Sequence, residues 1–367
     1  MSAARLTSIE ILRGIAALLV VWQHSSETFV RSPEIALHGT FLADIASSVD
    51  FGRIGVVCFF LISGFVIPFS FSSGSESIKK FAIRRFFRLY PVYWFSIALS
   101  ILLTYALSGE VVNTATILAN LTMIQTFLQE PHIQGLYWTL QIEVIFYLIC
   151  ACMHQCGLLN KSIFQLVGCI FFLGIFCILG IAEKYIPQFG QLNKELHYIP
   201  YVLSIMFSGT ILRTILTTQR SKRDLSILLL GPLSVFGIPL LVLLGHSLGI
   251  NIIGSPVRFG FGHLFGLALF VVGFYQLTTT RASLIWFGTT SYSIYLFHSF
   301  AIMFVGWMRT QEWASALVST HLSIYMLLVF LITLVVVFFT YNIVEKQSIE
   351  LGRRLTRKDR KTSEGLR

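Results

Sequence analysis

Hydrophobic residues in this chain gather into long, nearly uninterrupted runs that short polar stretches separate. Each run holds about 20 residues, the length that a helix needs to cross a hydrocarbon core roughly 30 Å thick. The pattern predicts ten such segments, with boundaries loose by several residues. They are 9–28, 53–72, 89–108, 136–156, 162–182, 197–217, 225–246, 257–279, 285–307 and 320–342. An amphipathic stretch near 113–128 predicts a short re-entrant or interfacial helix.

Composition favours the same fold class, an all-α integral membrane protein with about ten transmembrane helices. Of the 367 residues, 55% are hydrophobic and only 12% are charged, and the mean hydropathy is +0.76. Soluble domains carry about twice that charged share. The first run has little basic sequence before it, no small-residue cleavage site after it and two ionisable groups inside it, so we expect a retained span.

The six cysteines all fall inside apolar runs: Cys58, Cys150, Cys152, Cys156, Cys169 and Cys177. Their spacing matches neither a zinc motif nor a soluble disulfide framework. We therefore expect small buried hydrophobic side chains there, and we expect no metal site in this protein.

The net charge of +10 reflects topology rather than a nucleic-acid partner, because the basic residues fall mostly on one side of the predicted spans. If the N-terminus is cytoplasmic, the inner side holds Arg5, Lys79, Lys80, Arg84, Arg85, Arg88, Lys161, Arg213, Arg220, Lys222, Arg223, Arg281 and the basic residues after Tyr341. The outer loops and their edges hold Arg31, Arg53, Lys184, Lys194, Arg258 and Arg309. This bias predicts cytoplasmic termini and an even number of spans.

The same pattern predicts the domain organisation. Residues 1–345 are expected to form one transmembrane domain. Residues 346–367 are expected to form a short, basic, partly disordered cytoplasmic tail. No internal repeat and no inverted pair of broken helices is visible in the sequence, although transporters often carry such features.

Two ionisable residues lie inside the first span, where charge is costly and tends to mark a site. Arg13 and His24 are eleven positions apart, which is three helical turns plus about 20°, so both face one side of the helix. They are about 16 Å apart along its axis. An arginine that reaches the inner headgroups and a histidine at the outer interface would explain them equally well. A histidine can also exchange a proton near neutral pH.

Two further stretches combine aromatic and basic residues. In residues 55–70, Ser63 and Gly64 interrupt an aromatic helix, and the glycine permits either close helix packing or local unwinding. In residues 79–94, Arg85 and Arg88 share one face of a predicted helix start, with Arg84 beside them. Arginine forks suit phosphate oxygens, although positive-inside anchoring is the commoner explanation for such a cluster.

Two more polar features fall within predicted spans. Glu143 follows Trp138 in the fourth span, where an unpaired carboxylate is expensive, so a basic partner such as Arg13 or His24 is expected. Ser291, Tyr295 and His298 lie at positions i, i+4 and i+7 of the ninth span and form a polar stripe. Such a stripe lines either a cavity or a helix interface.

Taken together, these stretches resemble the acyltransferase-3 family of integral membrane acyltransferases, which O-acylate bacterial surface and exported glycans and some small molecules. The matching motifs are R-x10-H (Arg13, His24), FF-x-x-SGF (Phe59, Phe60, Ser63, Gly64, Phe65), R-x-x-R (Arg85, Arg88), W-[ST]-L-x-x-E (Trp138, Glu143) and S-Y-S-x-Y-L-x-H (Ser291, Tyr292, Ser293, Tyr295, His298). They follow the family order from residue 9 to about 345. Two departures are Val57, where many members have aspartate, and Glu345-Lys346-Gln347, which lacks the proline of a Glu-x-Pro motif.

The resemblance implies an acyl-CoA donor, by default acetyl-CoA, and a glycan or lipid-linked sugar as acceptor, such as O-antigen or exopolysaccharide. It places the protein in the bacterial inner membrane, in contact with membrane lipids and not with nucleic acid. Arg13 and His24 would be the essential pair, Glu143 the motif acid, and Arg85 and Arg88, with Arg84, the donor-side residues. The expected substrate contacts are Trp138, Ser63, Tyr295 and His298.

The residues leave two functions open. In an O-acyltransferase, His24 would be a general base or a transient acyl carrier. Arg13 would hold the donor or stabilise the thioester oxyanion, and Glu143 would orient or charge-balance one of them. In a transporter or flippase of a lipid-linked sugar or small solute, His24, Glu143 and His298 would relay protons.

Overall fold

The computed structural model describes residues 3–36, 38–72, 74–186, 194–217, 221–250, 253–279 and 281–364, and every regular element within these ranges is a helix. The long helices are α1 (Ala3–Val30), α4 (Phe51–Val66), α5 (Ser77–Ser108), α7 (Trp138–Gln155), α8 (Ser162–Tyr185), α9 (Lys194–Thr217), α10 (Lys222–Ser247), α11 (Pro256–Gln276), α13 (Ser291–Met308), α14 (Leu322–Thr340) and α15 (Lys346–Glu364). The shorter elements are α2 (Pro33–Ala36), α3 (Thr40–Ser48), η1 (Ile67–Phe69), α6 (Thr114–Leu121), η2 (Gly135–Tyr137), α12 (Ala282–Thr289), η4 (Glu312–Leu317) and η5 (Tyr341–Glu345). Arg220 and Arg367, which entered the topology prediction, lie outside the described residues.

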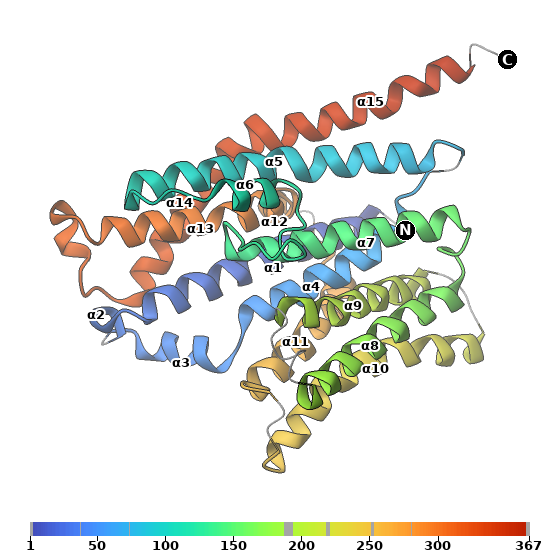
Figure 1. The fold of residues 1–367 in the computed structure, drawn as a ribbon, viewed down its shortest axis with the longest axis horizontal. Coiled ribbons are helices and arrows are strands. Elements are labelled where there is room, and N and C mark those ends of the chain that lie inside the picture. Colours follow the sequence, from blue (N-terminus) through green and yellow to red (C-terminus); the bar gives the residue numbers. More distant parts are fainter. Residues whose placement is uncertain are drawn as a thin grey trace.

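Nine helical stretches in the described ranges are long and apolar enough to cross a membrane. The predicted segment 285–307 is not one of them, because a turn at Thr290 divides it into α12 and α13 and polar residues line α13. With α13 as a further pass, both chain ends lie at the same end of the helices (Figure 1). The α4–α5, α7–α8 and α9–α10 connections lie at that end too. Its assignment to the cytoplasm stays a prediction.

Helix α4 lies at the centre of the packing, against α1, α9 and α11. A Cβ atom at Gly64 would lie 1.8 Å from the carbonyl oxygen of Met206, and one at Gly55 would lie 2.4 Å from that of Ala16. Only glycine allows such close approach of two backbones. Because α4 is continuous to Val66, close packing at Gly64 is confirmed and local unwinding there is wrong.

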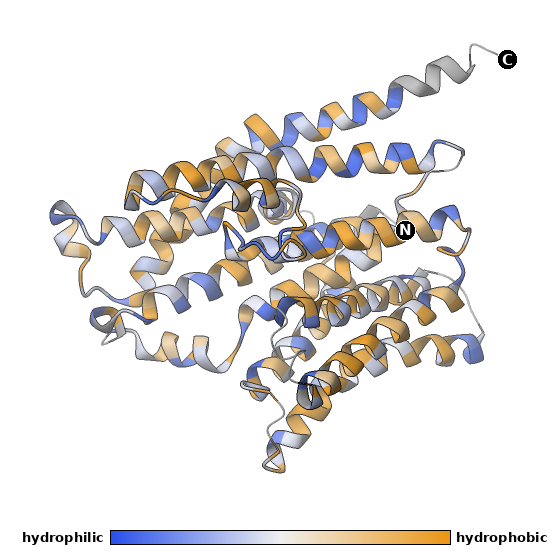
Figure 2. Cartoon of the chain, viewed as in Figure 1, coloured by the Kyte–Doolittle hydropathy of each residue, from blue (hydrophilic) through white to orange (hydrophobic). Residues whose placement is uncertain are grey.

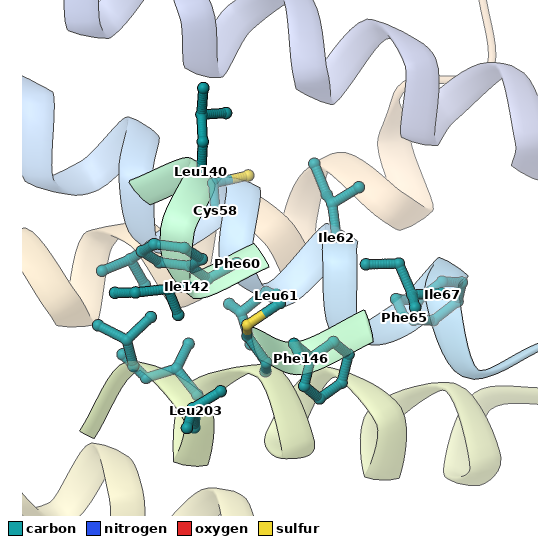
Figure 3. Packing of buried hydrophobic residues seen from close by; sticks show 14 of the residues in the cluster. Cys58, Phe60, Leu61, Ile62, Phe65, Ile67, Leu140, Ile142, Phe146 and Leu203 are labelled. Carbon is teal, nitrogen blue, oxygen red and sulfur yellow. The ribbon is translucent and has the colours of Figure 1, made fainter. Parts of the chain in front are cut away.

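The surrounding core is apolar on the sides of α4 that face its neighbours. Figure 3 shows Phe60 and Leu61 of α4 packed near Ile142 and Phe146 of α7 and Leu203 of α9. Hydrophobic residues cover most of the long helices other than α15, and hydrophilic bands gather at helix ends, in α15 and in the adjacent first part of α5 (Figure 2). The polar ends and apolar middles are those of helices that cross a hydrocarbon layer.

Several expectations about local structure need correction. Helix α5 begins at Ser77, twelve positions before the predicted segment, because its basic first turns are not apolar; the R-x-x-R pair therefore lies inside the helix, not at its start. The segment after 345, expected to be partly disordered, is helical to Glu364 and packs along α5. The amphipathic stretch 113–128 is helical only over α6, and turns follow it.

The cysteines divide into two groups, although all six were expected to be buried. Cys58, Cys150 and Cys169 are buried and match that expectation. The other three are exposed on the protein surface: Cys152, Cys156 and Cys177. All six carry free thiols.

Candidate functional site

Two histidines that are far apart in the sequence meet between α1 and α13. The Nδ1 atom of His24 lies 2.8 Å from the Nε2 atom of His298. His298 is fully buried, and its Nδ1 atom lies 2.8 Å from the carbonyl oxygen of Tyr295. Because a carbonyl only accepts, Nδ1 of a neutral His298 donates there, and its Nε2 accepts a hydrogen bond from Nδ1 of His24. This tautomer leaves Nε2 of His24 without a proton, as a general base requires.

His24 lines a cavity of about 570 Å³, here called the outer cavity, together with Trp138 and Tyr295. The lining is rich in polar side chains from several helices and from the segment before α7. These are Gln23, Glu27, Thr28, Asp50, Arg53, Gln134, Tyr198, Arg258 and Ser299. The structure therefore brings three of the predicted site residues to one cavity, and His298 supports the site from behind through its bond to His24.

A charged network that the sequence prediction missed forms part of this lining. Arg258 contacts the carboxylate of Glu27, and its Nη2 atom lies 3.6 Å from Oδ2 of Asp50. Arg53 lies 3.5 Å from the same Asp50 oxygen. The sequence did hold a sign of this network. Both arginines are predicted on the outer side, where the positive-inside bias disfavours basic residues, so a nearby acidic partner could have been expected. Glu27 lies three positions after His24, on the same side of α1.

Arg13 and Glu143 line a second, smaller cavity of about 50 Å³, the middle cavity, together with Ser63 and Tyr295. The carboxylate of Glu143 accepts a hydrogen bond from the hydroxyl of Tyr147, one turn further along α7. No ion pair of Glu143 is found in the described ranges, but Arg13, one of its two expected partners, lines the same cavity and is close enough to interact with the carboxylate electrostatically. The buried Nε atom of Arg13 has no hydrogen-bond partner.

The inner cavity, about 170 Å³, is lined by Arg84, Arg85, Arg88, Arg353, Ser70, Phe81 and Ile349. Arg85 donates from Nη2 to the Ser70 hydroxyl at 2.9 Å. Its guanidinium carbon lies 5.1 Å from the centre of the Tyr147 ring, within the range of a cation–π contact. Tyr147 therefore connects Arg85 to Glu143, and so the inner cavity to the middle one.

The three cavities follow one another along the helices. Val56 and Tyr295 line both the outer and the middle cavity. The contacts of Tyr147 connect the middle cavity to the inner one. Guanidinium groups that suit an anion thus lie at one end of this series, and a histidine with a free ring nitrogen lies at the other. Such an arrangement can hold a charged donor at one end and activate a hydroxyl at the other.

Comparison with known proteins decides the family. The sequence profile of a family described as an acyltransferase domain, acyltransferase-3, matches residues 6–342. This chain belongs to the acyltransferase-3 family. The match covers the helices that line the outer and middle cavities and the α5 side of the inner one. The sequence-based resemblance is confirmed, and with nine helices long and apolar enough to cross a membrane in the described ranges, the chain is a multi-pass membrane protein.

Two curated proteins are similar to parts of this chain. Acyltransferase MdmB of Streptomyces mycarofaciens is 30% identical over 153 residues, which cover 39% of this chain and 38% of MdmB. Nodulation protein 10 of Rhizobium leguminosarum bv. viciae is 26% identical over 212 residues, which cover 51% of this chain and 55% of that protein. The chain thus spans 38% and 55% of the lengths of these two relatives. No solved structure matches it significantly.

Proposed function

We propose that this acyltransferase moves an acyl group, by default acetyl, from acyl-CoA at the inner cavity to a glycan hydroxyl in the outer cavity. The observation that carries the proposal is the bond between His24 and His298, which leaves a basic nitrogen on the wall of a polar cavity. The acceptor class is a glycan such as O-antigen or exopolysaccharide, free or lipid-linked. The proposed location is the bacterial inner membrane, with the inner cavity open to the cytoplasm.

The outer cavity has features that suit a sugar. Its volume of about 570 Å³ lies within the range of roughly 300–1,000 Å³ that ligand sites occupy. The carboxylates of Glu27 and Asp50 accept hydrogen bonds, and Gln134 both donates and accepts, as sugar hydroxyls require. The ring of Trp138 adds an apolar face for the carbon side of a sugar.

The proposed reaction begins when Nε2 of His24 takes the proton of the acceptor hydroxyl. The hydroxyl oxygen then attacks the thioester carbonyl carbon, a C–O bond forms, and the C–S bond breaks. The CoA thiolate leaves with the pair of electrons from that bond, and the His24 imidazolium returns the proton to it. His298 keeps the His24 ring in one orientation through both proton transfers, as the third residue of a catalytic triad does.

The separation along α1 favours a donor-holding role for Arg13 over an oxyanion-stabilising one. An oxyanion donor must lie about 3 Å from the reacting oxygen, and the base must reach the same reacting centre. Arg13 is about 16 Å from His24 along the helix axis, so the two side chains could act on one thioester carbonyl only if both extended toward each other. We therefore propose that Arg13, with its unpartnered Nε, holds the pantetheine arm of the donor in the middle cavity.

Acetyl-CoA is expected to stabilise the purified protein against thermal unfolding. A ligand at 100 times its Kd stabilises the folded state by about 2.7 kcal/mol, which shifts the unfolding temperature measurably. The measurement is a thermal unfolding curve in zwitterionic lipid nanodiscs with acetyl-CoA, CoA or pantetheine, which lacks the nucleotide phosphates. Stabilisation by the first two but not by pantetheine supports the proposal. No shift with any CoA compound contradicts it and favours a transporter or flippase that uses the same intramembrane groups.

A further inference from the structure

The last helix, α15, forms one wall of the inner cavity. It packs along α5, and its Gly352 lies so close that a Cβ atom there would be 2.8 Å from Cβ of Phe87. Nε of Arg84 donates to the Thr356 hydroxyl at 3.0 Å. Ile349, Arg353 and Thr356 fall at i, i+4 and i+7, on one face of the helix. This docking presents Arg353 to the same cavity as the three arginines of α5.

Arginine side chains dominate the charge of this cavity. Four guanidinium groups line about 170 Å³, and no carboxylate is among the lining residues. Within the part of the chain that the structure describes, none of the four forms an ion pair. The nearby buried acid Glu345 accepts a hydrogen bond from Ser293 and interacts electrostatically with Arg88, but it does not line the cavity.

Adjacent like charges are unfavourable, by about 1 kcal/mol for two unit charges 4 Å apart in water and more where water is scarce. A bound anion offsets this repulsion, and several phosphate groups match four guanidinium groups better than one does. The next arginine along α15 differs: Arg354 pairs with Glu350 at 3.9 Å and does not line the cavity. On α15, Arg353 thus faces the cavity with no acidic partner, whereas Arg354 has one.

We propose that α15 completes the binding site for the phosphate groups of the acyl donor, and that Arg353 is the fourth arginine in contact with them. This inference rests on the proposed function, since the ligand is the phosphate-rich nucleotide of acyl-CoA, with a pyrophosphate and a 3′-phosphate. Anionic lipid headgroups share the phosphate chemistry, so the test must separate the two sources.

The test is calorimetric titration of CoA into the full-length protein in zwitterionic nanodiscs. Replacing Arg353 by glutamine is expected to weaken CoA binding about 10- to 100-fold, the usual effect of losing a hydrogen bond between charged groups. Arg353→Lys, which keeps a point charge, is expected to recover part of the loss. Arg354→Gln is the matched control, because it removes an equal charge one position away, and it is expected to bind CoA within about twofold of wild type. Unchanged unfolding temperatures verify that the variants fold.

The possible outcomes are distinguishable. Equal CoA affinity for wild type and Arg353→Gln overturns the role of α15 and leaves the proposed function standing. A failure of wild type to bind CoA overturns the proposed function itself. If Arg353→Gln and Arg354→Gln lose CoA affinity equally, the loss comes from the change in net charge, and a specific contact of Arg353 with the phosphates is contradicted. The titration is repeated in nanodiscs that contain anionic lipid. If Arg353→Gln changes CoA binding only in those nanodiscs, the cavity holds a lipid headgroup and the inference is wrong.

Discussion

Replacing His24 by alanine is expected to lower the rate of acyl transfer by about 10²- to 10⁴-fold, the usual contribution of a general base. The loss should appear in kcat, because the imidazole acts on the reacting hydroxyl rather than on the donor phosphates. The measurement is incorporation of radiolabel from acetyl-CoA into the glycan fraction of membrane vesicles at equal protein levels. The exposed His38 serves as the control position, where alanine should leave the rate unchanged.

Variants of His298 separate general-base catalysis from simple packing. His298→Gln keeps an acceptor for the Nδ1 proton of His24 and is expected to retain much more activity than His298→Leu, which does not. Equal loss in both variants would contradict a positioning role for this histidine.

The intact mass of the protein after incubation with acetyl-CoA alone tests the other role of His24, that of a transient acyl carrier. An added acyl group that is absent in His24→Ala would show an acyl carrier rather than a base.

The double substitution Arg85→Ala/Arg88→Ala is expected to weaken acetyl-CoA binding by about 100-fold or more. Each hydrogen bond between charged groups contributes about 1.5–3 kcal/mol, and 1.4 kcal/mol is a factor of ten in affinity. The effect should raise KM far more than it lowers kcat, since these groups hold the donor away from the reacting carbonyl. Titration calorimetry and steady-state rates measure the two parameters.

A control pair with the same charge change is available at the start of α10. Lys222 and Arg223 are exposed at the predicted inner end of the helices, and they do not line the inner cavity. The Lys222→Ala/Arg223→Ala variant should bind acetyl-CoA as wild type does. If both double variants lose equal affinity, or neither loses any, the arginines of α5 serve only as membrane anchors.

Features that lie within one helix could be predicted from the sequence. The common face of Arg13 and His24, the R-x-x-R pair and the stripe on α13 follow from helical spacing alone. The basic first turns of α5 and all of α15 were misjudged for one reason. Their sequences are not apolar, and only packing against each other, at Gly352 and Thr356, shows why they are ordered helices.

Contacts between helices could not be predicted in the same way. Because a buried carboxylate is costly, the sequence predicts a partner for Glu143, but it does not show which residue this is. In the structure, Tyr147 of the same helix donates a hydrogen bond to it. The hydrogen bond between His24 and His298 joins residues 274 positions apart, and it could not be predicted from the spacing of residues along the chain. The arginines of the outer cavity were visible only as exceptions to the charge bias.

We propose above all that this protein transfers an acyl group from acyl-CoA to a glycan. Mass spectrometry of the surface glycans of the native host, with and without the gene, tests it most directly. Glycans from cells with the gene are expected to carry an acyl mass that deletion removes, that wild-type protein restores and that His24→Ala does not restore. Identical glycan masses in all four strains would contradict it.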